Sequence, residues 1–388
     1  MYQSIYSPSR RGFIKQASYS LGIAGIGGAA ANPVFASQSL GMPSESVFPP
    51  EKKAGWAIVG LGKYATEQIM PAFAECKKSK LVALVSGTPD KAKKLADQYG
   101  VNSKNIYNYQ NYDSIKNNPE VDIIYIILPN SLHAEYTIRG AQAGKHMISE
   151  KPMATSVKDA QAMIDACKKA GKKLMIGYRA QYEPFNLKVI EMVRSNALGQ
   201  LKMITSDHGR ILKPEEKADQ WRMKKDLAGG GSLMDIGIYS LNAARYLTGE
   251  EPVEITAMMH STPNDPRFKE VEENMTFLLR FPSGVIAQCN SSYSYQEVKR
   301  YRVFGSEAWL DLDPATDYYR HTLHIGKKES KEQILLKEGN QFASQLDHFS
   351  ECVLENKEPK TPGEEGLQDL KLMMAIYEAA ASKEKVKV

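Results

Sequence analysis

The stretch WAIVGLGKYA at residues 56–65 decides the fold of this chain. It begins with a short apolar run and continues through Gly60 and Gly62 to Ala65, which fits the pattern G-x-G-x-x-A. The first glycine of this pattern permits a tight turn, and the second lets the backbone approach a pyrophosphate. The small third residue lets the following helix, whose N-terminus binds phosphate, pack closely. The stretch therefore predicts a strand, a phosphate-binding loop and a helix, and with them a dinucleotide site.

The segments that follow alternate between strand and helix patterns. Short apolar runs are separated by stretches in which apolar residues have helical spacing. This alternation is typical of a parallel sheet whose strands are joined by helices. We therefore expect a dinucleotide-binding Rossmann domain over residues 55–178. The expected strands cover 56–60, 81–85, 121–128, 146–148 and 173–177, and the expected helices cover 64–76, 89–99, 131–143 and 156–170.

The pattern changes after about residue 178. Apolar runs now follow one another through hairpin-like connections, of which Pro282-Ser283-Gly284 is a clear turn. We expect residues 179–388 to form an α+β domain with a large, open and mostly antiparallel sheet, which serves the substrate and oligomerisation. The fold class is α/β overall. The expected strands cover 201–206, 275–281, 285–291, 301–304 and 308–312, and the expected helices cover 184–195, 233–247, 342–354 and 367–381.

The N-terminus has the features of an export signal. Ser9-Arg10-Arg11-Gly12-Phe13 is a twin-arginine pattern, an apolar run covers 17–31, and Val34-Phe35-Ala36 offers a small-residue cleavage site. Residues 1–36 are therefore predicted to be a removable signal that the twin-arginine translocase reads, with the periplasm as the destination. A basic leader without a targeting role is the alternative. Residues 37–54 contain prolines and lack apolar periodicity, so we expect an extended arm there.

Composition excludes several classes of protein. The 388 residues carry a net charge of +5, and subtracting the three cations of the signal leaves +2. This near-balance gives no reason to expect binding to nucleic acid or to an anionic membrane, and the signal is no stable membrane anchor. The cysteines are widely spaced and form no C-x-x-C pair, so we expect neither a metal site nor a disulfide framework. They are Cys76, Cys167, Cys289 and Cys352.

The end of the second strand favours NADP over NAD. An NAD site normally places an acid there to bind the ribose hydroxyls, but this strand ends in Ser86-Gly87-Thr88. Lys91 and Lys94 follow on the next helix, and their ammonium groups suit a 2′-phosphate that an acid would repel. The alternative is that both lysines only solvate a helix face.

Three residues are candidates for catalysis. Lys151, within Glu150-Lys151-Pro152, follows an apolar strand at the sheet edge where open α/β folds bind ligands. In GGGSLMDIGIY at 229–239, Ser232 can cap a helix that carries Asp235 and Tyr239 at i and i+4. Tyrosine ordinarily ionises near pH 10, so as a base it needs a nearby cation. The alternatives are a surface lysine, and a tyrosine whose hydroxyl is bonded by the aspartate.

Longer strings identify a family. From about residue 55 to 378 the chain resembles the sugar and inositol dehydrogenases that combine a Rossmann domain with an antiparallel-sheet domain. Most of that family carries histidine where this chain has Tyr239, and tyrosine there is typical of its glucose-fructose oxidoreductase branch. The strings are IILPNSLHAE at 126–135, SEKPMATS at 149–156, KLMIGYR at 173–179, the triple-glycine stretch at 229–239 and DPAT at 313–316.

The resemblance implies roles for individual residues. Lys151 and Tyr239 would form the catalytic pair and Asp235 would position the sugar. Other residues would surround the 2′-phosphate and the nicotinamide ribose or cover the cofactor from the second domain. The motif and the resemblance together predict that NADP contacts Gly60, Gly62, Lys63, Tyr64, Ala65, Ser86, Lys91, Tyr109, Leu128, Pro129, Asn130, His133, Glu150, Lys151, Arg179, Trp221, Arg222 and Tyr318.

The resemblance also implies a two-stroke reaction. Tyr239 would take the anomeric proton of an aldose while hydride leaves C1, giving a lactone, and the hydride would then reduce a ketose such as fructose to an alditol. NADP would stay bound throughout, and the chain would form homodimers or homotetramers. One alternative is an aldose dehydrogenase or keto-sugar reductase with an exchangeable cofactor. Another is a sugar-binding protein that holds a cofactor without turnover.

Overall fold

A computed structural model describes residues 52–388 of the chain. The predicted signal at 1–36 lies outside the described residues, as does the predicted arm except for its last three positions. The two predicted domains both lie within the described part. No helix of residues 52–388 is both long enough and apolar enough to cross a membrane.

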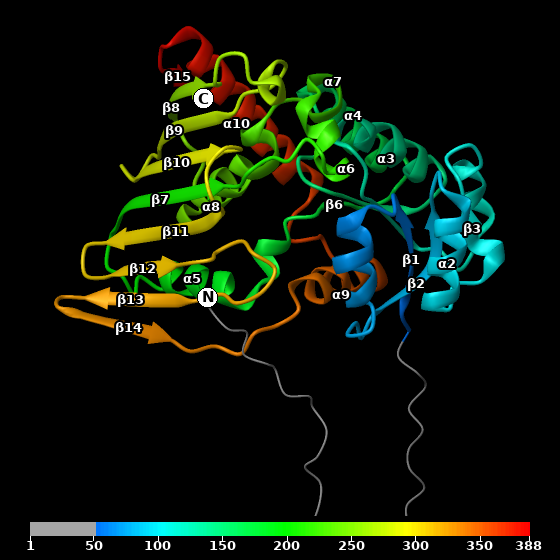
Figure 1. Ribbon diagram of the computed structural model, residues 1–388. Coiled ribbons are helices and arrows are strands. Elements are labelled where there is room, and N and C mark those ends of the chain that lie inside the picture. Colours follow the sequence, from blue (N-terminus) through cyan, green and yellow to red (C-terminus); the bar gives the residue numbers. More distant parts are fainter. Residues whose placement is uncertain (1–51) are drawn as a thin grey trace, which may run out of the picture. The chain divides into compact units, whose positions relative to one another are not determined.

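The first sheet has six parallel strands in the order β3-β2-β1-β4-β5-β6. Strand order reverses at β1, because β2 lies on one side of it and β4 on the other. Figure 1 labels β1, β2, β3 and β6 of this sheet. Ligands of open α/β sheets bind at such a reversal, beyond the carboxyl ends of the strands. The strands are β1 Ala54–Val59, β2 Ser79–Val85, β3 Ile106–Tyr107, β4 Ile123–Ile126, β5 His146–Ser149 and β6 Leu174–Ile176.

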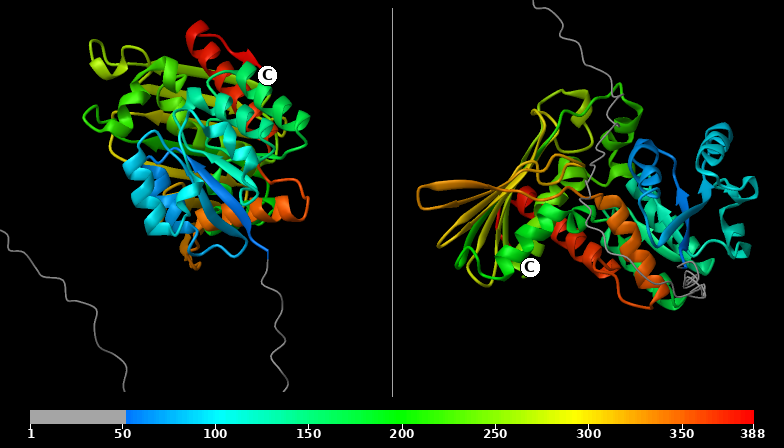
Figure 2. Two further views of the ribbon diagram at one scale, coloured as in Figure 1. Left: turned by 90° about the vertical axis from the view of Figure 1, so that its right-hand side faces the viewer. Right: turned by 90° about the horizontal axis from the view of Figure 1, so that it is seen from below.

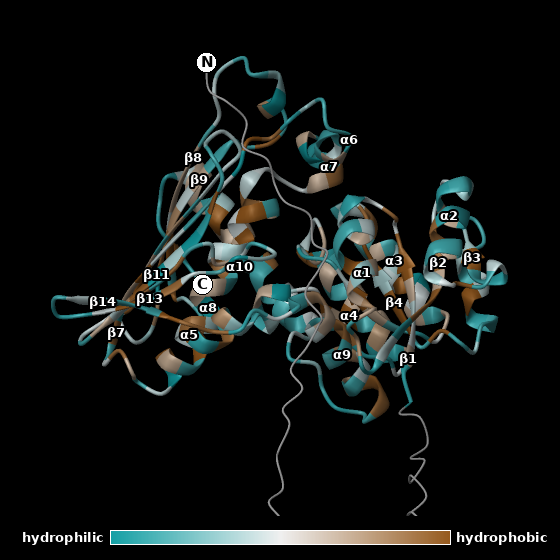
Figure 3. Cartoon of the chain, turned by 60° about the horizontal axis from the view of Figure 1, so that its bottom comes forward, coloured by the Kyte–Doolittle hydropathy of each residue, from teal (hydrophilic) through white to brown (hydrophobic). Residues whose placement is uncertain are grey.

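The helices of this domain begin and end where local sequence signals place them. Helix α2, Pro89–Tyr99, has proline in its first turn and ends at Gly100, which has a φ of 67°. The Ser156 hydroxyl accepts from Asp159 N at 3.1 Å and so caps α4, Val157–Lys169. In Figure 3 strands such as β4 carry the brown of hydrophobic residues, whereas α2 is largely the teal of hydrophilic ones. Helix α3 covers His133–Gln142, and the glycine-rich loop leads into η1 Ala65–Ile69 and α1 Met70–Ala72.

The second sheet has nine strands in the order β14-β13-β12-β11-β7-β10-β9-β8-β15. Only β7 and β10 pair in parallel, and every other pair is antiparallel. The predicted fold class is thus confirmed. The strands are β7 Leu201–Gly209, β8 Glu254–His260, β9 Asn274–Arg280, β10 Ile286–Ser292, β11 Val298–Gly305, β12 Trp309–Leu312, β13 Leu323–Lys327, β14 Ser330–Ile334 and β15 Val386–Lys387.

One face of the second sheet is covered and the other is open. Along β9, Met275, Phe277 and Leu279 are buried while Thr276 and Leu278 are exposed, as expected for a half-covered antiparallel sheet. Figure 2 shows the sheet edge-on, with helices on one side only. The longer helices of this half are α5 Pro184–Arg194, α8 Ile238–Thr248, α9 Gln341–Leu354 and α10 Gly363–Ser382. The shorter ones are η5 Arg179–Tyr182, α6 Lys217–Gln220, η6 Trp221–Met223, α7 Lys225–Ala228, η7 Leu233–Gly237 and η8 Pro266–Phe268.

Helix α9 packs on the first sheet although it follows the strands of the second. Its buried side chains Phe342 and Phe349 share an apolar core with β1 and β2. The Trp56 indole donates to the Ser350 hydroxyl at 2.9 Å, and its ring meets Phe349 edge-on at 6.1 Å. The amphipathic pattern of α9 predicts a helix, but not the sheet on which it docks.

The helix that carries Asp235 and Tyr239 does not start as the sequence suggests. Its first turn, η7, is a π-helix, and the predicted cap Ser232 instead hydrogen bonds the Ser291 hydroxyl at 3.0 Å. The buried carboxylate of Glu272 accepts from Gly231 N at 2.7 Å and from Leu233 N at 2.9 Å. The prediction of a serine cap is therefore wrong, because a carboxylate from a segment distant in the sequence satisfies the free N–H groups instead.

Candidate active site

The glycine-rich loop has the shape that a pyrophosphate requires. Gly60 has a φ of 92°, and a Cβ there would lie 2.2 Å from the Ile127 carbonyl oxygen, so only glycine fits. A Cβ on Gly62 would instead point into open space, which leaves this side of the loop accessible to a ligand. Ala65 is buried and lets the helix pack close to the sheet, while Lys63 is exposed beside it. The loop therefore fits the predicted dinucleotide.

One of the two lysines predicted to suit the 2′-phosphate reaches the glycine-rich loop. The Lys91 ammonium donates to the Leu61 carbonyl oxygen, which places a positive charge next to the glycines. The Ser86 hydroxyl accepts from Thr88 N at 3.1 Å at the end of β2, and the Tyr109 ring lies against Gly87. Lys94, the second lysine considered, is exposed on α2.

The end of β4 is fixed by its neighbours. Asn130 donates to the Ala228 carbonyl oxygen at 2.8 Å and so ties this strand end to the second half of the chain. The His133 ring is fully buried and binds the carbonyl oxygens of Leu128 at 2.8 Å and Pro152 at 2.9 Å. Burial lowers the pKa of His133, although the hydrogen bonds to the backbone carbonyl oxygens oppose this shift. His133 thus holds the ends of β4 and β5 together, and half-buried Pro129 borders the crevice.

Lys151, Asp235 and Tyr239 meet although they come from different halves of the chain. The Lys151 ammonium donates to the Asp235 carbonyl oxygen at 2.6 Å and lies 3.9 Å from Oδ1 of the same residue. It also lies 4.5 Å from the centre of the Tyr239 ring. The Lys151 side chain is only 10% exposed, which rules out the surface-lysine alternative.

The phenol and the carboxylate have separate partners. The Tyr239 hydroxyl accepts from Arg179 Nη2 at 3.1 Å, whereas the Asp235 carboxylate accepts from Arg222 Nε at 3.0 Å and from Arg210 Nη2 at 3.2 Å. The alternative in which Asp235 binds the tyrosine hydroxyl is therefore wrong. The π-turn is the reason: its backbone bonds span one residue more than those of an α-helix, so the i and i+4 positions no longer stack.

The Asp235 carboxylate stays ionised. Burial by itself would raise its pKa, but the cations of Arg222, Arg210 and Lys151 outweigh burial and hold the pKa well below the usual range. A permanently charged acceptor at this place suits the hydroxyl groups of a sugar, because hydrogen bonds to an ionised acceptor are the stronger ones.

Arg179 is the centre of an aromatic cluster. It is 4% exposed, and its guanidinium carbon lies 4.7 Å from the centre of the Tyr318 ring. The Tyr64 ring lies 6.1 Å from Tyr318. Glu150 accepts from the Tyr125 hydroxyl at 2.5 Å, and burial raises the pKa of Glu150. These residues close the end of the crevice on the side of β1 and β5.

The second half of the chain also contributes the Trp221 segment. The Arg222 guanidinium carbon lies 4.5 Å from the centre of the Trp221 ring, and both side chains are half-buried. The structure therefore brings Arg222 into direct contact with Asp235, and Trp221 reaches Asp235 through Arg222.

Sequence reasoning missed several residues of this site. His208 is buried and stacks on Tyr239, with ring centres 5.5 Å apart and planes at 17°. Burial, helped by the nearby cations of Lys299 and Lys151, lowers the pKa of His208 to about 3. The only available signal was alternation along the strand, which puts His208 on the covered face of β7. The others missed are Arg210, Tyr125, Tyr293 and Gln341.

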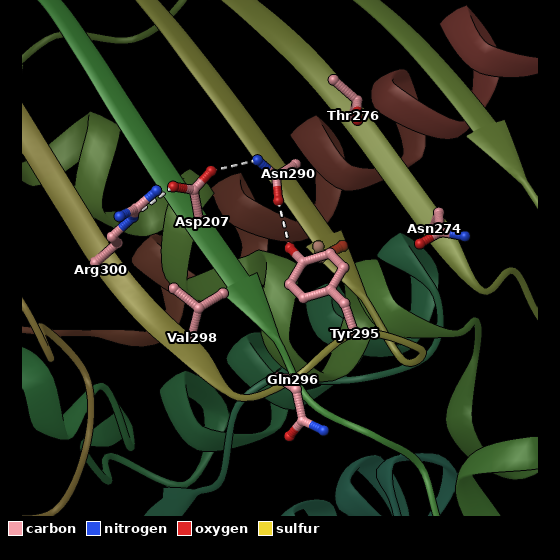
Figure 4. A pocket seen from close by; sticks show the side chains of 9 residues that line it. Asp207, Asn274, Thr276, Asn290, Tyr295, Gln296, Val298 and Arg300 are labelled. Atoms are coloured by element: carbon pink, nitrogen blue, oxygen red, sulfur yellow. Dashed lines mark hydrogen bonds and ion pairs between the residues drawn. The ribbon is translucent and has the colours of Figure 1, made fainter.

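A separate hollow lies on the open face of the second sheet (Figure 4). It has a volume of about 620 Å³ and is lined mostly by polar residues. Asp207 accepts from Arg300 Nε at 2.8 Å, and Tyr295 donates to the Asn290 side chain. Residues 52–388 contain no group of three or more His, Cys, Asp or Glu side chains arranged to hold a metal ion.

Comparisons with known proteins match nearly the whole described chain. Residues 54–178 match the family model "Oxidoreductase family, NAD-binding Rossmann fold", and residues 190–388 match "Oxidoreductase family, C-terminal alpha/beta domain". The aldose-aldose oxidoreductase of Caulobacter crescentus, solved with glycerol, is 50% identical, with a TM-score of 0.84 over 87% of this chain and 100% of that one.

Two further relatives are more distant. The D-xylose 1-dehydrogenase [NADP(+)] of Haloarcula marismortui is 29% identical over 86% of this chain and 92% of its own. A 3-ketoreductase of Actinomadura kijaniata, solved with NADP and TDP-benzene, is 25% identical, with a TM-score of 0.75 over 84% of this chain and 98% of that one.

The charge of Asp235 should contribute measurably to the free energy of unfolding. Asp235→Asn is expected to lower the free energy of unfolding by about 3 kcal/mol near neutral pH, because it removes the counter-charge of three cations. Since the folded-state pKa is depressed, this contribution is complete above the ordinary aspartate range and is lost as the pH falls below about 4. Urea unfolding at several pH values measures the difference.

Asp226, exposed on α7, supplies the control. Asp226→Asn should change the free energy of unfolding by less than about 0.5 kcal/mol at every pH. A gap between wild type and Asp235→Asn that widened on acidification would show that the carboxylate is not held in its charged form.

Proposed function

Because the chain belongs to the oxidoreductase family with an NAD-binding Rossmann fold and a C-terminal alpha/beta domain, we propose that it couples two sugar reactions on one NADP. One aldose is oxidised at C1 to a lactone, and a second sugar is reduced to an alditol. The contact of the Lys151 ammonium with the Tyr239 ring, beside a loop that fits a dinucleotide, carries this proposal.

The choice of NADP over NAD rests on the residues near the end of β2 and on the relatives. Lys91 and Ser86 lie where an acid would bind the ribose of NAD, and β2 ends without an acid. The xylose dehydrogenase is named for NADP(+), and the ketoreductase was solved with NADP. Bound NADP supplies the acceptor and donor of the hydride.

The residues of this chain transfer the proton and position the sugar. The Tyr239 oxygen removes the proton of the C1 hydroxyl in the oxidation and returns a proton to the carbonyl oxygen in the reduction. The Lys151 ammonium, 4.5 Å from the ring centre, favours negative charge on that oxygen. The ionised Asp235 accepts hydrogen bonds from sugar hydroxyls and fixes which carbon faces the nicotinamide.

The proposed identity of the second sugar is based on the 50% identical structure, which is named an aldose-aldose oxidoreductase. We therefore propose an aldose as the acceptor, whereas the resemblance in the sequence alone implied a ketose. The dehydrogenase alternative, with an exchangeable cofactor, is supported by the xylose dehydrogenase relative. A binding protein without turnover fits poorly, because such a role requires no meeting of Lys151 with Tyr239.

Coupling can be tested without adding cofactor. The purified chain, mixed with one aldose and either a second aldose or fructose, should form lactone and alditol in equal amounts. Tyr239→Phe should slow both reactions at least about a hundredfold, because it removes the group that transfers the proton. Chromatography of the products measures turnover, and native mass spectrometry measures bound nucleotide.

Tyr319→Phe is the matched control, since Tyr319 is exposed and its hydroxyl donates to Gln68 Oε1 at 3.1 Å. It should keep full activity. Turnover that begins only when NADP is supplied would reject coupling in favour of the exchangeable-cofactor dehydrogenase. A chain that binds nucleotide yet oxidises no aldose would support the sugar-binding protein.

We also propose that the twin-arginine pattern exports the folded chain to the periplasm with NADP already bound. Replacing Arg10 and Arg11 by lysine should retain the full-length chain in the cytoplasm of a bacterial host. The unaltered chain should appear in the periplasmic fraction and begin at Ser37, as measured by N-terminal sequencing. Lys15→Arg is the control and should be exported normally. Equal export of all variants would reject the pathway.

We further propose that the open face of the second sheet binds a second copy of the chain. Exposed Leu278 and Ile286 give this face an apolar part, and the Arg300–Asp207 pair beside them supplies both signs of charge for a self-complementary contact. Their neighbour Met258 is also exposed, and the hollow of Figure 4 lies between these regions.

Native mass spectrometry tests this contact. The unaltered chain should give dimers or tetramers, and Leu278→Lys with Ile286→Lys should give monomers that retain nucleotide, because two ammonium groups would have to be buried. Leu187→Lys, an exposed position on α5 away from this face, should leave the assembly unchanged. Assemblies that survive the double substitution would place the interface elsewhere.

A further inference from the structure

We propose that Arg179 is a positioning residue that stabilises the ionised oxygen of Tyr239, which leaves the Lys151 ammonium free to bind the substrate hydroxyl. The proposal rests on the sugar-oxidising half of the proposed function and not on the coupling of two sugars. The two cations thereby acquire different tasks, although both lie beside the same phenol.

The contacts of Arg179 carry the first step. Its Nη2 donates to the Tyr239 oxygen at 3.1 Å and to the Thr316 carbonyl oxygen at 2.6 Å. Its Nη1 donates to the Asp317 carbonyl oxygen at 3.1 Å and to Gln341 Oε1 at 2.7 Å. These acceptors are neutral, so they fix the guanidinium in place without cancelling its charge.

The charge of Arg179 therefore lacks a direct counter-ion. Among the described residues, no carboxylate oxygen lies within 4.0 Å of its guanidinium, and the side chain is almost fully buried. A buried charge is costly until an opposite charge approaches it. Ionised Tyr239 would supply that charge at hydrogen-bond distance, and hydrogen bonds between charged groups are the strong ones.

Lys151 is arranged differently. Its ammonium donates to the Asp235 carbonyl oxygen at 2.6 Å and lies 3.9 Å from the Asp235 carboxylate, so its charge is already partly balanced. It faces the centre of the Tyr239 ring at 4.5 Å, whereas Arg179 bonds the oxygen. An ammonium has three donors, so two remain for a substrate hydroxyl.

The donation from Arg179 also orients the phenol. Because the guanidinium hydrogen approaches one lone pair of the Tyr239 oxygen, the phenol's own hydrogen points away from Arg179. The proton is thus directed toward the remaining open side, where a sugar oxygen can exchange it.

The other ionisable groups facing Tyr239 do not titrate near neutral pH. His208, stacked on the ring, has a pKa lowered to about 3 by burial and nearby cations. Burial raises the pKa of Tyr318 to about 12, and Asp235 stays ionised. These three groups therefore keep their charges between about pH 5 and 9. The Arg179 cation also lowers the pKa of Glu150 and of Asp317, so a change in the pH dependence of an Arg179 variant is weighed together with guanidinium rescue and the rate of Arg179→Lys.

The test uses the chain with its bound nucleotide and follows reduction of that nucleotide by an aldose in a single turnover. Arg179→Gln should slow this step roughly ten- to a hundredfold at neutral pH and recover as the pH is raised, because higher pH restores the ionised phenol. Arg179→Lys should retain most of the rate. Guanidinium added to Arg179→Ala should restore part of it.

Several measurements separate this role from a purely structural one. Thermal unfolding and native mass spectrometry report whether each variant folds and holds its nucleotide. Arg194→Gln, which removes a guanidinium from the last turn of α5, should leave the rate and its pH dependence unchanged. If Arg179→Gln fails to fold, guanidinium rescue of Arg179→Ala and the rate of Arg179→Lys decide the question.

The outcomes also distinguish this inference from the proposed function. Suppose that the wild type is active, but that Arg179→Gln lowers the rate equally at every pH or that guanidinium does not rescue Arg179→Ala. Either result would overturn the role of Arg179 and leave the proposed function standing. If none of the aldoses supplied reduces the bound nucleotide of the wild type, the proposed function is overturned, and this inference with it.

Discussion

The site depends on one contact across the chain: the Lys151 ammonium against the Asp235 carbonyl oxygen at 2.6 Å and the Tyr239 ring at 4.5 Å. Lys151 follows strand β5 of the first sheet, and the other two residues lie in the first turns of a helix that covers the second sheet. A flexible amine can join them only if both halves keep a fixed geometry. The tie from Asn130 to the Ala228 carbonyl oxygen and the docking of α9 on the first sheet provide that rigidity.

The balance of charge in the crevice follows from this geometry. Lys151, Arg210 and Arg222 bring three cations close to the carboxylate of Asp235, and Arg179 adds a fourth at the Tyr239 oxygen. This positive charge disfavours any further protonated group. The stacked ring beneath Tyr239, His208, accordingly stays neutral. A histidine there packs the tyrosine without adding a charge that would compete for its oxygen.

Local patterns predicted most of the fold and the core of the site. The glycine-rich loop, the strands of the first sheet and the matched family were readable because each depends on a short run of residues. Strands β3, β8, β13, β14 and β15 were missed; β3 and β15 have two residues each, and β14 is polar and exposed. The docking of α9, the Glu272 cap, and the approach of Arg179 and His208 to Tyr239 depend on residues far apart in sequence, which no local pattern records. The predicted signal lies outside the described residues.

Retention of the cofactor and recognition of the sugar share one set of ion pairs. The Trp221 segment, predicted to cover the cofactor, is anchored because Arg222 bonds the Asp235 carboxylate at 3.0 Å. Lifting that segment would separate a largely buried pair, at a cost of several kcal/mol. The carboxylate proposed to orient the sugar therefore also opposes release of the dinucleotide. These contacts support the proposal that two half-reactions run on one bound NADP.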